Sequence, residues 1–387
     1  MKRADSVKTQ YGFDSGNYNP NTFNSLDASV CFLFVIVLSF IVQIVFRFAF
    51  NAYKQTHESF DYYLWSIISV FLAQAVIFLV AFFAGKIRRV GFLTGGGFNF
   101  SFDKIEVLFS VMLALGIALV FLGVHQQFVD DVWRITYGAD YDAFMQNLNE
   151  QVDGNLLLAL FYSLIVAPIV PAIVEEGLFR GVVLRGARQI GPLFAIFISG
   201  LCFSLMHGNL EQLILQFIFG VSVGAVVLLT KNFLLGSVMH FTNNLMVYLL
   251  AVVSNIAGYY SDSAYYFVDA FSIIIGVALL VVSVTYFINK LLAKQKKKLL
   301  NIPRKRSESD EKKYALICLD GGEDVFGVEP IYSKVFIDEI NASSFEWSGK
   351  TYHYKGEINV MNGKASVLAS KIIFAIGIAL SVVFIFI

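Results

Sequence analysis

Residues 171–186, PAIVEEGLFRGVVLRG, place two glutamates and two arginines inside an otherwise apolar stretch. The chain around this stretch has 387 residues, of which 57% are hydrophobic and 15% charged, and its mean hydropathy is +0.67. Soluble domains are typically about 45–50% apolar and about 25% charged. The composition therefore indicates an integral membrane protein, and it excludes a soluble enzyme, a fibrous repeat and a disordered chain.

Several apolar runs are long enough for membrane helices, which need about 20 mostly apolar residues. We expect spans at residues 28–50, 62–85, 105–125, 155–174, 191–207, 211–229, 232–250, 267–289 and 370–387. The predicted fold class is thus an all-α polytopic membrane protein. Its domains would be a disordered N-terminus at 1–27, an eight-helix transmembrane core at 28–289, and a ninth, C-terminal transmembrane helix at 367–387.

The loops between these spans alternate between basic and non-basic. Basic residues follow the second, fourth, sixth and eighth spans, whereas residues 126–153 carry only Arg134 against six acidic residues, and 251–266 carry no Lys or Arg. Loops rich in Lys and Arg stay on the cytoplasmic side of a membrane. We therefore expect a multi-pass protein of a bacterial cell membrane with a cytoplasmic N-terminus.

Two segments separate the eight-span core from the last helix. Residues 290–313 are rich in Lys and Arg. Such a segment usually anchors the end of a membrane helix to anionic lipid. A site for a partner or a nucleic acid is the alternative, and we expect no nucleic acid. Residues 314–366 alternate apolar and polar positions with Gly at the turns, as in YALICLD at 314–320. This pattern predicts a small β-rich cytoplasmic module, near the lower size limit for an independent core.

A short set of polar residues lies at membrane depth, where an ionisable side chain costs several kcal/mol. Counted from the basic span ends at a helical rise of about 1.5 Å per residue, they lie roughly 13–24 Å from the cytoplasmic interface. Polar groups from three helices therefore meet at one level, and this convergence predicts a shared functional site. The candidates are Glu175, Glu176, Arg180, His207, His240 and Asn244.

Spacing within these motifs has a physical meaning. Glu176 and Arg180 are four residues apart and can form an ion pair on one helix face, while Glu175 is turned away by about 100°. His240 and Asn244 are also four apart, so that both can face a common point. A desolvated carboxylate such as Glu175 is suited to act as a general base near neutral pH.

Each motif also has a purely structural interpretation. Glu176 and Arg180 could be only a buried ion pair, His207 an ordinary polar core residue, and His240 and Asn244 a hydrogen-bonding link between helices. The occurrence of all these residues at one depth in the membrane favours a functional site. A helix over 155–188 would be too long for one perpendicular span, and Pro168 and Pro171 offer a kink or a break there.

The ordered motifs resemble the CPBP family of intramembrane proteases, which includes type II CAAX prenyl endopeptidases and bacteriocin-processing and self-immunity proteins. The family pattern is EExxxR, then FxxxH, then HxxxN on successive core helices. This chain reads EEGLFR at 175–180, FSLMH at 203–207 and HFTNN at 240–244. The resemblance covers roughly residues 150–250, and it does not explain the β-rich segment or the ninth span.

The resemblance implies a glutamate-type endopeptidase. Glu175 and His207 would activate the attacking water, His240 and Asn244 would stabilise the oxyanion, and Glu176 with Arg180 would hold the site together. No cofactor is expected. Zinc held by Glu175, His207 and His240 is the alternative, although HExxH is absent and Asn is a poor zinc ligand.

We therefore expect an intramembrane endopeptidase that acts on peptide or protein substrates in or at the lipid bilayer, by CAAX-type or leader-peptide processing. Two other functions compete with it: a non-catalytic membrane scaffold or immunity protein, and a secondary transporter that uses the carboxylates as proton relays. Binding alone does not require Glu175, and no inverted repeat supports a transporter. The sequence does not identify the substrate.

Overall fold

The structure is a computed structural model, and it describes most of the helical part of the chain. The described residues are 23–56, 62–88, 103–137, 161, 165–188, 190–208, 210–260, 262–300, 314–318, 332–336, 344–347, 350–353 and 364–385. Of the expected N-terminal disordered segment, residues 1–22 lie outside this description, and so do residues 301–313 of the expected basic segment.

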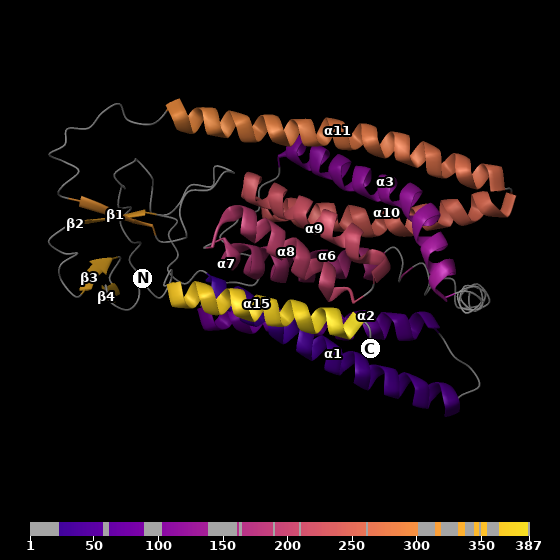
Figure 1. The fold of residues 1–387 in the computed structure, drawn as a ribbon, viewed down its shortest axis with the longest axis horizontal. Helices are drawn as coiled ribbons and strands as arrows, with labels where there is room; N and C mark the ends of the chain where they lie inside the picture. The colour runs from indigo at the N-terminus through magenta and orange to yellow at the C-terminus, as the bar shows by residue number, and fades with distance from the viewer. Residues whose placement is uncertain are drawn as a thin grey trace.

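Long helices that run along a common direction form the body of the protein (Figure 1). Turn residues Arg188, Ile190 and Lys231 lie between neighbouring members of the series. The helices are α1 (Ser25–Thr56), α2 (Tyr62–Arg88), α3 (Lys104–Tyr137), α6 (Ala167–Leu178), η3 (Phe179–Leu184), α7 (Arg185–Ala187), α8 (Pro192–Met206), α9 (Leu210–Thr230), α10 (Phe233–Tyr260), α11 (Asp262–Leu300) and α15 (Lys364–Ile385).

Six helices in the described part of the chain are long and apolar enough to cross a membrane: Ser25–Thr56, Ile67–Arg88, Lys104–Phe121, Gln212–Thr230, Tyr266–Ala293 and Val367–Ile385. They confirm six of the expected spans, and the protein is a multi-pass integral membrane protein. The other three expected spans overlap α6, α8 and α10, which carry the polar motifs. The count of eight core helices stays a prediction.

In the described part of the chain, four short strands lie between α11 and α15. β1 (Tyr314–Cys318) pairs antiparallel with β2 (Tyr332–Phe336), and β3 (Ser344–Trp347) pairs antiparallel with β4 (Lys350–His353). Each pairing forms its own two-stranded sheet. A single folded module over residues 314–366 therefore stays a prediction.

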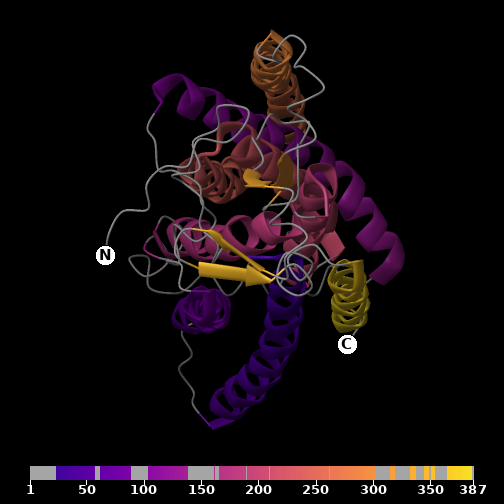
Figure 2. The ribbon, with the colours of Figure 1, turned by 90° about the vertical axis from the view of Figure 1, so that its left-hand side faces the viewer.

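The helices that carry the polar motifs lie in the middle of the bundle. Figures 1 and 2 show α6, α8, α9 and α10 between α3 and α11 on one side and α1, α2 and α15 on the other. α6 packs against both α10 and α2, and α8 packs against α9. Three buried aromatic residues of this central group, Phe179, Phe203 and Phe219, belong to the main hydrophobic core.

A proline stands in the first turn of α6, and a glycine follows α8. Pro168 occupies the first or second position of α6, where a missing N–H is tolerated. Residues 165 and 166 before it form a π-helical turn, so the chain is already helical when it reaches this proline. Gly208 has φ 63°, a left-handed conformation that glycine adopts readily, and it ends α8 immediately after His207.

The last helix is integrated into the bundle, because α15 packs along α1. The hydroxyl of Ser370 donates a hydrogen bond to that of Ser25 at 2.9 Å, and both side chains are buried. The rings of Phe40 and Phe384 stack with their centroids 3.7 Å apart. The helix that the family resemblance left unexplained therefore contributes to the packing of the first span.

Candidate functional site

The centre of the site is a buried group of charges on one helix. Glu175 and Glu176 lie in the last turns of α6, and Arg180 lies in the π-helical turn η3 that follows. Their exposed fractions are 4%, 0% and 0%. Such charges are tolerated in an apolar interior only when other polar groups compensate them.

The predicted ion pair between Glu176 and Arg180 is confirmed. Arg180 Nη1 lies 2.7 Å from Glu176 Oε1, and Arg180 Nη2 donates to the carbonyl oxygen of Gly220 on α9 at 3.0 Å. The guanidinium carbon lies 4.8 Å from the centre of the Phe203 ring on α8, a cation–π distance. One arginine thus joins three helices.

The π-helical turn is held by a side chain of the neighbouring helix. A π-turn widens the helix and is frequently found at functional sites. Ser199 on α8 donates its hydroxyl to the carbonyl oxygen of Phe179 at 3.0 Å. This bond fixes α8 against the turn that carries Arg180.

His240 on α10 lies between the two glutamates. Its Nδ1 is 3.0 Å from Glu176 Oε1, and its Nε2 is 3.9 Å from Glu175 Oε2. Because an ionised carboxylate only accepts, Nδ1 carries the proton in the first contact. Gly236 makes this approach possible, since a Cβ there would lie 2.8 Å from Glu176 Oε2. Glu176 therefore orients His240 so that Nε2 faces Glu175.

The carboxylate of Glu175 is anchored at one oxygen. Gln74 on α2 donates its side-chain amide to Glu175 Oε1 at 2.6 Å. Among the described residues, Oε2 has no hydrogen-bond partner. The carboxylate thus presents one fixed, unpaired oxygen to the space beside His240.

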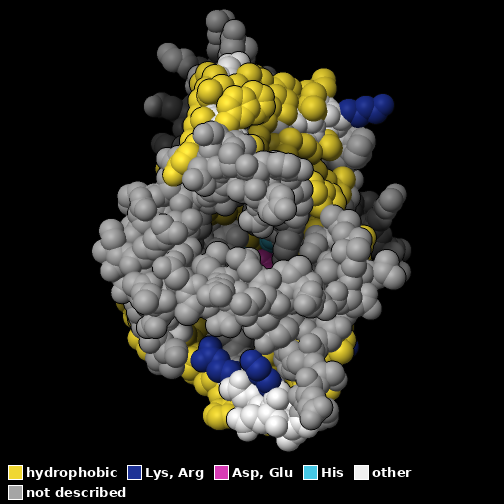
Figure 3. Space-filling view, turned by 90° about the vertical axis from the view of Figure 1, so that its right-hand side faces the viewer, with side chains coloured by type: hydrophobic (Ala, Val, Ile, Leu, Met, Phe, Trp, Pro, Cys, Tyr) yellow, Lys and Arg dark blue, Asp and Glu magenta, His cyan; other side chains and the backbone are white. Residues whose placement is uncertain are grey.

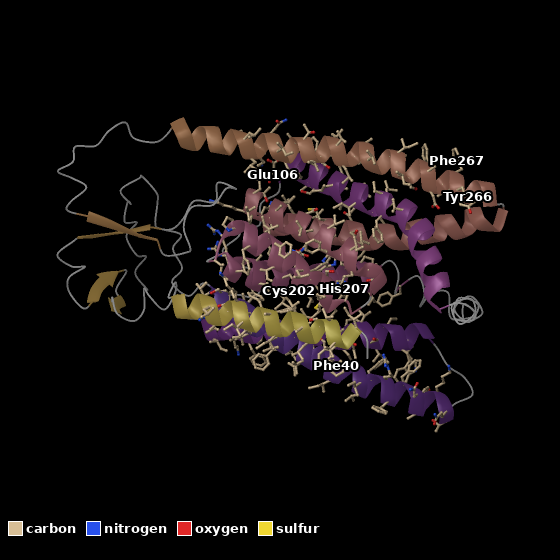
Figure 4. All side chains as sticks on the ribbon, in the orientation of Figure 1. Phe40, Glu106, Cys202, His207, Tyr266 and Phe267 are labelled. Carbon is tan, nitrogen blue, oxygen red and sulfur yellow. The ribbon has the colours of Figure 1, made fainter. Side chains whose placement is uncertain are left out.

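His207 reaches the same region through Phe203. Its Nδ1 lies 2.8 Å from the Phe203 carbonyl oxygen, and since a carbonyl only accepts, Nε2 is left as the basic nitrogen. The Phe203 ring centre is 4.9 Å from that of His207 and 5.3 Å from that of His240. Figure 4 shows His207 in the interior of the bundle. Phe203 thus forms the surface between the two histidines.

Polar side chains are visible from one end of the bundle. Figure 3 looks onto the end at which α8 terminates, and atoms of acidic and histidine side chains can be seen from there. The exposed fractions along α8 agree with this view, because Ser204 and Leu205 are buried, His207 is partly exposed and Gly208 is exposed. His207 therefore lies on the less buried side of the site, whereas Glu175, Glu176, Arg180 and His240 are buried.

Asn244 makes a contact that its motif did not predict. Its Nδ2 donates to the Ala167 carbonyl oxygen at 3.3 Å. Pro171 stands four residues after Ala167 and has no N–H to give to that carbonyl. The asparagine amide thus replaces the helical hydrogen bond that Pro171 cannot make, which ties α10 to the start of α6.

The structure thus brings Glu175, Glu176, Arg180 and His240 into direct contact and places His207 beside them through Phe203, with Asn244 one turn further along α10. Sequence reasoning missed Gln74 as a member of the site. The available signal was a single amide in the apolar span 62–85, which by itself does not indicate a partner.

A zinc site at Glu175, His207 and His240 was the alternative interpretation of the motifs. Within the described part of the chain, no group of three or more His, Cys, Asp and Glu side chains is arranged to hold a metal ion. One oxygen of Glu175 is also occupied by the Gln74 amide. The geometry therefore does not fit a metal centre at these residues.

The fold and the site define a multi-pass membrane protein with a buried glutamate–histidine–arginine cluster. Residues 156–246, which contain all three motifs, match the family model described as type II CAAX prenyl endopeptidase Rce1-like. The chain thus carries a domain of the Rce1-like type II CAAX prenyl endopeptidase family, a family of peptidases. No curated protein and no solved structure matches the chain.

The contact of Asn244 gives a testable expectation. Asn244→Ala leaves the Ala167 carbonyl unpaired and should lower the free energy of unfolding by about 1–3 kcal/mol. Adding Pro171→Ala supplies a backbone N–H, so the double variant should recover most of this loss in detergent unfolding. Thr242→Ala, which removes a hydroxyl that donates to the Val238 carbonyl within α10, is the neighbouring control. Equal destabilisation with and without Pro171→Ala would contradict this role.

Proposed function

We propose that the protein is an intramembrane endopeptidase that hydrolyses peptide bonds of membrane-associated substrates, by CAAX-type or leader-peptide processing. The observation that carries the proposal is the unpaired Oε2 of Glu175, 3.9 Å from His240 Nε2, inside a domain of a peptidase family. The substrates are peptides or proteins in or at the lipid bilayer, and no nucleic acid takes part in the reaction.

In the proposed reaction, Glu175 and His207 act on the attacking water. Glu175 Oε2 takes a proton from the water, His207 Nε2 orients it, and the hydroxide adds to the scissile carbonyl carbon. The C–N bond then breaks, and the leaving amine takes the proton from Glu175. General-base catalysis of this kind typically contributes about 10²–10⁴-fold in rate.

His240 and Asn244 stabilise the oxyanion in this proposal. His240 donates to Glu176 through Nδ1, and as an oxyanion donor it would use a proton on Nε2. A preorganised donor in a dry site stabilises developing negative charge most effectively. The Nδ2 of Asn244 has a second hydrogen besides the one given to Ala167.

Two alternatives make different use of the same residues. The zinc-dependent form of the protease would require Glu175, His207 and His240 as ligands. A non-catalytic scaffold or immunity protein would bind a peptide without cutting it. Glu175 Oε2 is buried beside a histidine and has no hydrogen-bond partner among the described residues. Burying an unpaired oxygen costs free energy and stabilises neither the fold nor the binding of an apolar ligand. Its presence therefore supports hydrolysis over binding alone.

We also propose that the protein spans a bacterial cell membrane with its N-terminus and residues 290–366 on the cytoplasmic side. Most basic residues with described side chains lie at the ends of helices on one side of the bundle: Lys86, Arg88, Arg185, Arg188, Lys231 and Lys290, against Arg47 and Lys54 on the other. This asymmetry follows the positive-inside rule.

Orientation is testable by cysteine labelling in a variant without its native cysteines. Thr56→Cys and Lys86→Cys stand at exposed positions near opposite ends of the bundle. A membrane-impermeant maleimide should label Thr56→Cys in intact cells and Lys86→Cys only after permeabilisation. The reverse pattern would invert the proposed orientation.

The proposed chemistry predicts that Glu175→Gln and His207→Ala each abolish proteolysis while the protein stays folded and inserted. Their effects should be non-additive, as for residues that act on one water. The assays are cleavage of a farnesylated CAAX peptide by purified protein and mass spectrometry of peptides from membranes of cells with and without Glu175→Gln. Asp269→Asn, a buried carboxylate on α11, is the matched control and should retain activity.

Exhaustive treatment with a zinc chelator distinguishes the two hydrolytic forms. If Glu175 and His207 activate the water without a metal, the rate of cleavage should stay within about 2-fold of that of the untreated protein. If a metal generated the nucleophile, removing the metal would abolish cleavage. Loss of activity that returns with added zinc would establish the zinc-dependent form.

A further inference from the structure

Among the described residues, Gln74 donates a hydrogen bond to Glu175 from outside the family domain. Gln74 lies on α2, which precedes the matched residues 156–246. We propose that Gln74 is a positioning residue for the hydrolytic reaction, which directs proton uptake to Oε2 of Glu175. This inference rests on the proposed function.

The placement of Gln74 on its helix supports a specific role. Gln74 is buried, and so are Ile77 and Ala81, which lie three and seven residues further along the same face of α2. This face packs against α6, the helix that carries Glu175. By contrast Gln43, the corresponding amide on α1, is exposed. The apolar helix thus turns a polar side chain inward, towards one carboxylate.

The chemistry of the bond makes the two oxygens of Glu175 unequal. A hydrogen bond from a buried donor to an ionised carboxylate is short and strong, and the 2.6 Å contact to Oε1 is of this kind. A donor on Oε1 lowers the basicity of that oxygen. The proton from the water therefore goes to Oε2, the oxygen that faces His240 at 3.9 Å.

The geometry of the unpaired oxygen fits this assignment. A separation of 3.9 Å between Oε2 and His240 Nε2 is too long for a direct hydrogen bond, and it allows one water to contact both atoms. With Oε1 tethered, the carboxylate plane cannot rotate to bring both oxygens into other contacts. Gln74 thus keeps the base in the orientation that the reaction requires.

The test compares Gln74→Leu with Gln43→Leu, the same change at an exposed amide of another membrane helix. Gln74→Leu keeps the apolar packing and removes the donor. For cleavage of the farnesylated CAAX peptide, kcat should fall by up to about 100-fold, the order of effect of a small misplacement of a reacting group, with KM within about 2-fold. Gln43→Leu should match the wild type.

The pH profile separates positioning from a structural role. Because the lost donor favours the ionised carboxylate, the acid limb of kcat in Gln74→Leu should move to higher pH. Gln74→Asn, which keeps a shorter amide, should be intermediate. In Gln74→Glu, a protonated carboxyl can donate at low pH and repels Glu175 when ionised, so its optimum should move to lower pH.

The outcomes distinguish this inference from the proposed function. Wild-type kcat and an unshifted acid limb in folded Gln74→Leu, with Glu175→Gln inactive, would overturn the positioning role alone. Full activity of Glu175→Gln would overturn the proposed function itself. If Gln74→Leu does not fold, the Gln74→Asn and Gln74→Glu profiles decide, and unshifted profiles in both overturn the positioning role.

Discussion

The constraint on which the structure depends is the burial of two carboxylates and a guanidinium on one apolar helix. Isolated charges in such an interior are prohibitively costly, so neighbouring helices contribute compensating groups. Gly220 on α9 offers a carbonyl, His240 on α10 a ring nitrogen and Gln74 on α2 an amide. The bundle is arranged around these bonds.

The same compensation is incomplete at several atoms of the described residues, and the proposed chemistry lies at one of them, Glu175 Oε2. Arg180 and His240 both bond to Glu176 Oε1, whereas Gln74 bonds to Glu175 Oε1, and Oε2 of each glutamate is unpaired among the described contacts. Two adjacent glutamates thus acquire different roles through their surroundings: Glu176 binds Arg180 and supports the histidine, whereas Glu175 is held by an uncharged amide. Successive positions of a helix face different neighbours, so two identical side chains can acquire different partners and roles.

The contacts also show why the motif-bearing segment does not form the site alone. The family domain covers residues 156–246, but the Gln74 amide and the packing of α1 against η3 come from helices before it. α15, after it, packs along α1 through Ser370 and Phe384. A helix that follows the β-strands in sequence therefore stabilises the first helix of the bundle.

The sequence by itself determined the membrane class, six of the spans, the motif residues and the Glu176–Arg180 pair, because hydropathy and four-residue spacing are local properties of a helix. It did not determine which oxygen of Glu175 is free, the capping of Ala167 by Asn244, or the Gln74 contact. Those depend on which helix faces which, and residues 74 and 175 are 101 positions apart. Only tertiary packing decides such partners, since a buried polar group bonds with whatever group the neighbouring helix places within reach.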